Sequence, residues 1–149
     1  MTQAACKTQA KLVRLLRGEV CVRARVGQAN TLLLDFGVLH DPDRHGYRES
    51  DKWLVAECPW RLERKDAVVV GNGDAANRVE SPLQACVGKR LVRITVYRPS
   101  YMLHLRFDND LRFWLFPDDA AVYAPGGESS AAPWYVGGRA ILGDAEDAP

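Results

Sequence analysis

The sequence lacks any apolar run close to the roughly 20 residues that a membrane-spanning helix needs. Basic residues near the N-terminus are mixed with apolar ones instead of preceding an apolar block, which is a poor match to a signal peptide. We therefore expect a cytoplasmic protein without a membrane association.

Cysteine and histidine are both scarce. The four cysteines, Cys6, Cys21, Cys58 and Cys86, form no C-x-x-C pair and lie among apolar neighbours, which favours buried, reduced thiols over disulfides or zinc ligands. Two of the three histidines lie in HDPDRH at 40–45, where the spacing fits no standard metal site. We expect no metal and no cofactor.

Signatures of catalysis are missing too. No serine lies in a G-x-S-x-G turn, and no two carboxylates are placed where burial would separate an acid from a base. The stretch VVVGNGDAA at 68–76 has the outline of a dinucleotide-binding turn, but such a turn must open a helix, and Ser81-Pro82 indicates a later helix start. We therefore expect a protein that is not an enzyme, with a small enzyme of unknown class as the last alternative.

What the sequence does contain is a repeated order of segments. VCVRARV at 20–26 falls on RLVRITV at 90–96, TLLLDF at 31–36 falls on MLHLRF at 102–107, and Pro-Trp at 59–60 recurs at 133–134. This recurrence indicates a tandem duplication, with chance similarity between β-rich segments as the alternative. We predict a single domain over 1–149, made of pseudo-repeats at about 1–76 and 77–144 with a short acidic C-terminal tail.

Each half is predicted to hold one short helix followed by strands. An apolar stripe runs from about Thr2 to Arg17, and Ser81 with Pro82 suggests the N-cap and first residue of the second helix. Apolar and polar residues alternate in the segments that follow, which is typical of strands with one covered face; the segments are 20–26, 92–97 and 101–107. Residues 111–116 are apolar on both faces and predict a central strand. The fold class is therefore mainly β (α+β), an internally duplicated antiparallel sheet or sandwich.

The repeated Pro-Trp pair predicts a buried anchor for the last strand of each half. Proline suits a strand entry because it cannot donate to a ladder, and tryptophan beside it can bury a large area. A ligand-stacking role for Trp60 and Trp134 is the less favoured alternative.

Charge is unevenly distributed along the chain. Residues 1–116 carry 19 basic and 13 acidic side chains, whereas 117–149 carry one basic and six acidic. Five arginines lie on predicted strands, and if these strands are neighbours they form a basic face near Tyr97 and Trp114; they are Arg23, Arg25, Arg93, Arg106 and Arg112. Such a face can bind single-stranded nucleic acid or an acidic protein, or it can be solvated without a specific role. A pI near 7.7 makes nucleic acid the less favoured partner.

The polar segment at 37–51 is an insertion relative to the second half. Loops on a rigid scaffold are favoured binding sites, and Tyr and Arg are favoured contact residues, although a solvated mobile loop is the competing interpretation. The candidate partner-binding residues are Asp41, Asp43, Arg44, His45, Tyr47 and Arg48, with Arg23, Arg25, Arg93 and Arg106 extending the footprint.

Several short patterns occur in a familiar order. They are W-R-L at 60–62, V-x-G-x-x-D at 69–74, L-x-x-x-x-G-x-x-x-V at 83–92, alternating Leu and Phe from Leu103, and a late Trp. This order resembles a loose group of small uncharacterised bacterial β-rich proteins that look like immunity proteins of polymorphic toxin systems. The resemblance implies a protein that neutralises a cognate toxin by direct binding. The alternative is a nucleic-acid-binding or regulatory module that uses the arginine-rich sheet face.

Overall fold

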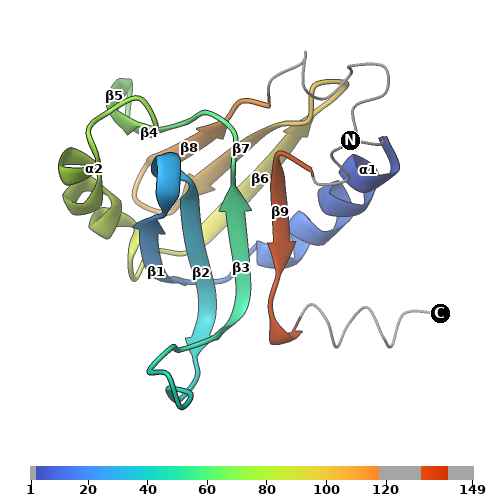
Figure 1. Cartoon of the computed structure of the whole chain (residues 1–149). Coiled ribbons are helices and arrows are strands. Elements are labelled where there is room, and N and C mark those ends of the chain that lie inside the picture. The colour runs from blue at the N-terminus through green and yellow to red at the C-terminus, as the bar shows by residue number, and fades with distance from the viewer. Residues whose placement is uncertain (1–2, 118–131, 141–149) are drawn as a thin grey trace.

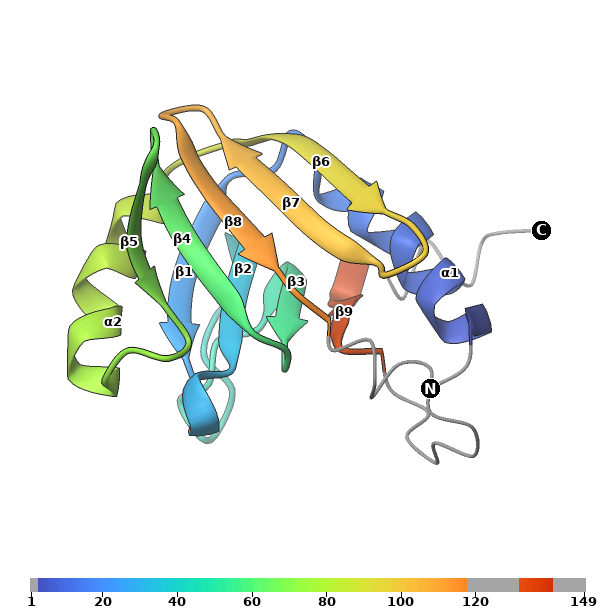
Figure 2. The same ribbon diagram turned by 90° about the horizontal axis from the view of Figure 1, so that it is seen from above.

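The computed structural model describes residues 3–117 and 132–140, whose strands form two antiparallel sheets packed face to face (Figures 1 and 2). One sheet has the order β1-β2-β3-β9 and the other β5-β4-β8-β7-β6. The elements are α1 (Gln3–Leu12), η1 (Val13–Leu16), β1 (Cys21–Val26), η2 (Gln28–Asn30), β2 (Leu32–Leu39), β3 (Ser50–Ala56), β4 (Trp60–Arg64), β5 (Ala67–Gly71), α2 (Ala76–Leu83), η3 (Gln84–Cys86), β6 (Leu91–Tyr97), β7 (Met102–Phe107), β8 (Leu111–Leu115) and β9 (Trp134–Gly137). The predicted fold class is confirmed, and β8 is central in its sheet as expected.

The fourth strand of each half joins the sheet of the other half. β4 follows β3 along the chain but pairs with β8, and β9 follows β8 but pairs with β3. The two crossings are held in the same way: the carbonyl of Pro59 accepts from the Phe116 N–H at 2.8 Å, and that of Pro133 accepts from the Glu57 N–H at 2.9 Å. Each half therefore completes the other half's sheet.

The two repeated tryptophans anchor these exchanged strands. Trp60 and Trp134 are each 1% exposed. The indole N–H of Trp60 donates to the carbonyl of Asn30 at 2.7 Å, and that of Trp134 donates to the carbonyl of Tyr101 at 2.8 Å. Both acceptor residues have a positive φ, of 53° and 59°, a conformation uncommon outside glycine. The predicted burial of both tryptophans is confirmed, and the polar end of each indole is satisfied.

The halves make reciprocal backbone hydrogen bonds where they meet. Gly18 N–H donates to the Leu91 carbonyl at 2.7 Å, and Gly88 N–H donates to the Cys21 carbonyl at 2.8 Å. Both glycines have a φ of +85°, a backbone conformation that residues with a Cβ atom rarely adopt. These reciprocal bonds place the same turn of each half against the first strand of the other half.

The strict alternation predicted over 20–26 is wrong at its start. The register of β1 against β2 shifts between Cys21 and Arg23, which is a β-bulge. Cys21 and Ala24 are therefore both buried, whereas Val22 is only partly covered. β6 carries the same irregularity at the equivalent residues.

The predicted start of the second helix at Ser81-Pro82 is also wrong. α2 begins at Ala76 and has Pro82 in its last turn. Val79 and Leu83 lie one helical turn apart and are both completely buried, so the apolar pair fixes the helix upstream of the proline. No helix among the described residues is long and apolar enough to cross a membrane.

All four cysteines are buried, as predicted, and Cys21, Cys58 and Cys86 are free thiols. Burial raises the pKa of the Cys21, Cys58 and Cys86 thiols to about 12. Residues 118–131 and the acidic C-terminal tail lie outside the described residues.

Replacing either buried tryptophan should strongly destabilise the whole domain. We expect Trp60→Ala and Trp134→Ala each to lower the free energy of unfolding by about 3–5 kcal/mol, the usual range for a core aromatic. The measurement is urea denaturation followed by circular dichroism. Val38→Ala, at a valine that is 57% exposed, is the control and should stay within about 0.5 kcal/mol of wild type. A loss below about 1 kcal/mol at either tryptophan would contradict the anchoring role.

Candidate functional site

The arginines expected to form one face are divided between the two sheets. Arg23 and Arg25 lie on β1, whereas Arg93, Arg106 and Arg112 lie on β6, β7 and β8 of the other sheet. The prediction of a single basic face is therefore wrong for Arg23 and Arg25. Alternation along a strand identifies its solvated side, but it does not identify the sheet to which the strand belongs.

The segment between β2 and β3 is an ordered hairpin extension. The Asp43 carboxylate accepts from the backbone N–H of His45 at 2.8 Å and of Tyr47 at 3.0 Å, and Gly46 closes the tip with a φ of +81°. The guanidinium of Arg48 donates to the carbonyls of Leu39 and His40 at 3.0 and 2.8 Å. The chain's own side chains thus fix the loop conformation.

Tyr47 folds back over the outer face of β1. Its ring centroid lies 5.3 Å from the Arg23 guanidinium and 5.7 Å from that of Arg25, within the range of a cation–π contact. Beneath them Asp35, 3% exposed, accepts from Arg23 Nε at 2.8 Å and from the Ser50 hydroxyl at 2.6 Å. The bond to Asp35 raises the pKa of Arg23 further. A neutralised, partly buried ion pair therefore supports the exposed tyrosine.

A groove of about 340 Å³ lies between this hairpin and the outer face of β2 and β3. Its lining includes Leu33, Tyr47, Trp53 and Val55. The Trp53 ring lies over Gly137 so closely that a Cβ there would approach it to 2.3 Å, which requires glycine. We call residues 37–51 together with this groove the hairpin surface.

The remaining candidates of the loop are at its tip or base. Asp41, Arg44 and His45 are exposed at the tip, and His40 Nε2 lies 2.6 Å from Asp51 Oδ1 at the base. No group of three or more His, Cys, Asp or Glu gathers within 3–117 and 132–140 in a way that could hold a metal.

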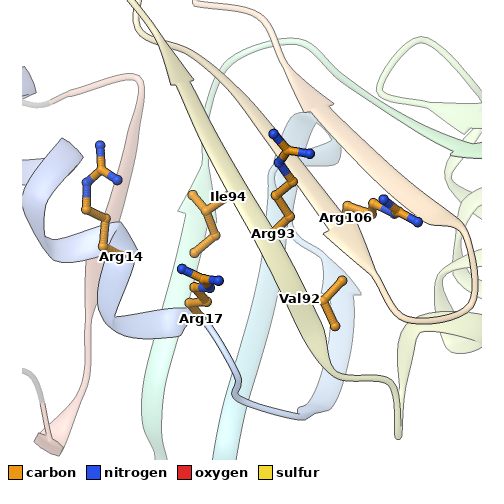
Figure 3. A pocket seen from close by; sticks show the side chains of 6 residues that line it. All are labelled: Arg14, Arg17, Val92, Arg93, Ile94 and Arg106. Atoms are coloured by element: carbon orange, nitrogen blue, oxygen red, sulfur yellow. The ribbon is translucent and has the colours of Figure 1, made fainter.

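On the other sheet, arginines line a cleft of about 650 Å³ (Figure 3). Arg14 and Arg17 come from the end of the first helical segment, Arg93 from β6 and Arg106 from β7. Among the described residues no carboxylate lies within 4.0 Å of Arg14, Arg17 or Arg93, and Arg106 is 3.9 Å from Asp110. We call this site the arginine cleft. Arg14 and Arg17 were missed by sequence reasoning because Arg14 lies on η1 and Arg17 in the turn after it, and neither is on a strand.

A second depression of about 350 Å³ adjoins the arginine cleft and shares Arg93 and Arg106 with it. Tyr97 and His104 also line it, and both pack on Trp114, with ring centroids 6.1 and 4.1 Å away. His104 is half-buried in this aromatic cluster. Burial, followed by the positive charge of nearby arginines, lowers the pKa of His104, against a smaller opposing effect of Glu63.

The glycine-rich turn at 71–74 does lead directly into α2, so the reason given above for excluding a dinucleotide site was wrong. The turn is nevertheless filled by the chain itself. The Asp74 carboxylate accepts from the Gly71 N–H at 2.7 Å, and the Asn30 side chain donates to the carbonyls of Asn72 and Asp74. β5 is also antiparallel to β4, whereas a dinucleotide turn belongs to a parallel βαβ unit.

Comparisons of the chain with protein-family models, with curated proteins and with solved structures gave no match. Function has therefore to be inferred from the hairpin surface and the arginine cleft themselves.

His104 should make the fold less stable in mild acid. Because its pKa is lowered from about 6.5 in the folded state, the unfolded chain takes up the proton first as the pH falls. The stability that neutral His104 provides is therefore present above about pH 6.5 and lost below it. We expect the free energy of unfolding of wild type to fall relative to His104→Gln between about pH 7 and pH 5, measured by urea denaturation. The control is His45→Gln at the exposed tip; a constant difference between wild type and His104→Gln would contradict the assignment.

Proposed function

We propose that this protein is an immunity-type protein that neutralises a cognate bacterial toxin by direct binding, with the hairpin surface as the contact region. The supporting observation is the preformed hairpin that holds Tyr47, 45% exposed, above a groove with an aromatic wall. The choice of a toxin as partner follows the resemblance of the sequence patterns to immunity proteins.

A preformed loop favours tight binding for a thermodynamic reason. Ordering a mobile loop at an interface costs free energy that reduces affinity. Here the Asp43 carboxylate and the Arg48 guanidinium already hold the hairpin before any partner arrives. Most of the binding energy of the contacts at its tip is therefore available for affinity.

The groove defines the chemistry of the partner. Leu33, Trp53 and Val55 provide an apolar wall, and Arg25 and Glu49 add one charge of each sign. A side chain that fills this groove is apolar or aromatic, with both acidic and basic groups around it. Buried aromatic anchors surrounded by polar groups are the usual arrangement of binding hot spots.

Tyr47 and Arg48 have different roles in this proposal. Tyr47 presents an exposed ring and is the direct contact. The Arg48 guanidinium donates to two carbonyls of its own hairpin, so it acts mainly by holding Tyr47 in place.

The function is tested with the protein encoded beside this chain in its genome. That neighbour is expressed in a bacterial host alone and together with this chain, and survival is measured. We expect the neighbour to be toxic alone and harmless when this chain is present. A neighbour that is harmless by itself, or that kills equally in both cases, contradicts the proposal.

The contact region is tested with Tyr47→Ala and a matched control. Loss of a hot-spot tyrosine should weaken toxin binding by about 2 kcal/mol, or roughly 30-fold, measured by titration calorimetry. Tyr97→Ala removes a tyrosine of similar exposure, 41%, from the opposite sheet and should leave the affinity within about threefold of wild type. Thermal melting of both variants checks folding. If Tyr47→Ala binds like wild type, the contact region lies elsewhere.

A further inference from the structure

The two halves carry different charges at structurally equivalent positions. In the first half Arg23 of β1 lies opposite Asp35 of β2. In the second half Arg93 of β6 lies opposite Arg106 of β7, after the same bulge. The partner that neutralises the first arginine is therefore replaced by a second positive charge.

The helical segments of the two halves also differ in charge, and the one beside the arginine cleft is the more positive. The carbonyl of Gln84 accepts from the Val87 N–H at 3.2 Å, and the carbonyl of Arg14 accepts from the Arg17 N–H at 3.2 Å, so the two turns correspond. In one half the Gln84 side chain donates to the Ala24 carbonyl on β1 at 3.0 Å. In the first half, no described residue accepts a corresponding hydrogen bond from the Arg14 side chain. Arg17 occupies the position that Val87 has in the second half.

The arginine cleft is the combined result of these three replacements. At the equivalent place in the other half, the chain has the neutral amide of Gln84, the side chain of Val87 and the Arg23–Asp35 ion pair. The cleft instead has four guanidinium groups around a volume of about 650 Å³. Four like charges around one space repel one another and gain stability when an anion enters. The fold itself does not require them, because the other half reaches the same backbone arrangement without them.

We infer that the arginine cleft binds phosphate groups. Guanidinium groups bind phosphate through paired, charge-assisted hydrogen bonds, and four arginines spread along one cleft suit a ligand with more than one phosphate. The cleft volume lies within the usual range for small-ligand sites. The adjoining depression offers Tyr97, whose ring could stack on a base, so the phosphates can come from a free oligophosphate ligand or from a nucleic-acid backbone. This site lies on the sheet opposite the hairpin surface and does not depend on the proposed toxin binding.

The proposal is tested by adding inorganic tripolyphosphate to the full chain in a titration calorimeter. Single-stranded oligodeoxythymidylate is used in parallel, with fluorescence anisotropy as the readout. The decisive variant is Arg106→Asp, which gives Arg93 the carboxylate that Arg23 has in Asp35. We expect it to melt at or above the wild-type temperature and to weaken binding by about tenfold or more.

Arg106→Gln removes a single charge without adding a new one and should also weaken binding by about tenfold. The matched control is Arg78→Gln on α2, at the end of the molecule away from α1, which makes the same change in net charge (Figure 1). It should bind as wild type does.

Each outcome decides the proposal. If the protein binds tripolyphosphate and both Arg106 variants weaken this binding, a free oligophosphate ligand is supported. If it binds only the oligonucleotide and both variants weaken that binding, a nucleic-acid source of the phosphates is supported. No binding of either probe at low ionic strength overturns the proposal. Binding that Arg78→Gln weakens as much as Arg106→Gln also overturns it, because net charge and not the cleft would then be responsible.

Discussion

Two indole N–H groups fix the crossing of the chain from one half to the other. Trp60 donates to the Asn30 carbonyl and Trp134 to the Tyr101 carbonyl, and each indole is buried at the first residue of an exchanged strand. Because the four-stranded sheet takes β9 from the second half and the five-stranded sheet takes β4 and β5 from the first, neither half alone has a complete sheet. The core is consequently continuous between the sheets, with Phe36 and its counterpart in the second half stacked at 6.3 Å.

This exchange also determines where binding surfaces can form. The inner faces of both sheets are occupied by the shared core, so only the outer faces, the loops and the free edges remain for partners. The hairpin surface uses the outer face of β2 and β3, and the arginine cleft lies where η1 approaches β6, the free edge of its sheet. Substitutions at these places change the surface chemistry without removing a core contact.

Much of the fold could be predicted from the sequence because its signals are local or repeated. Burial of Trp60 and Trp134, the central position of β8 and the mainly β class all follow from apolar pattern and recurrence. The exchange of strands could not be predicted, because alternation reveals which face of a strand is covered and contains no information about its neighbour. For the same reason Arg23 was grouped with Arg93 although they lie in different sheets. The role of Asp35 was missed since one buried carboxylate leaves no periodic signal.

The two candidate surfaces contain residues at corresponding register positions of the two halves. Arg23, neutralised by Asp35, donates to the Arg48 carbonyl and lies under the Tyr47 ring, so in the first half the pair supports the hairpin. At the equivalent place in the second half the carboxylate is replaced by Arg106, and an open basic cleft results. The second half keeps the same strand pairing with Arg106 opposite Arg93, so this exchange changes the surface charge while the backbone arrangement stays the same. Two halves with the same strand order can in this way hold an ordered hairpin on one sheet and a cationic cleft on the other, from the same backbone position.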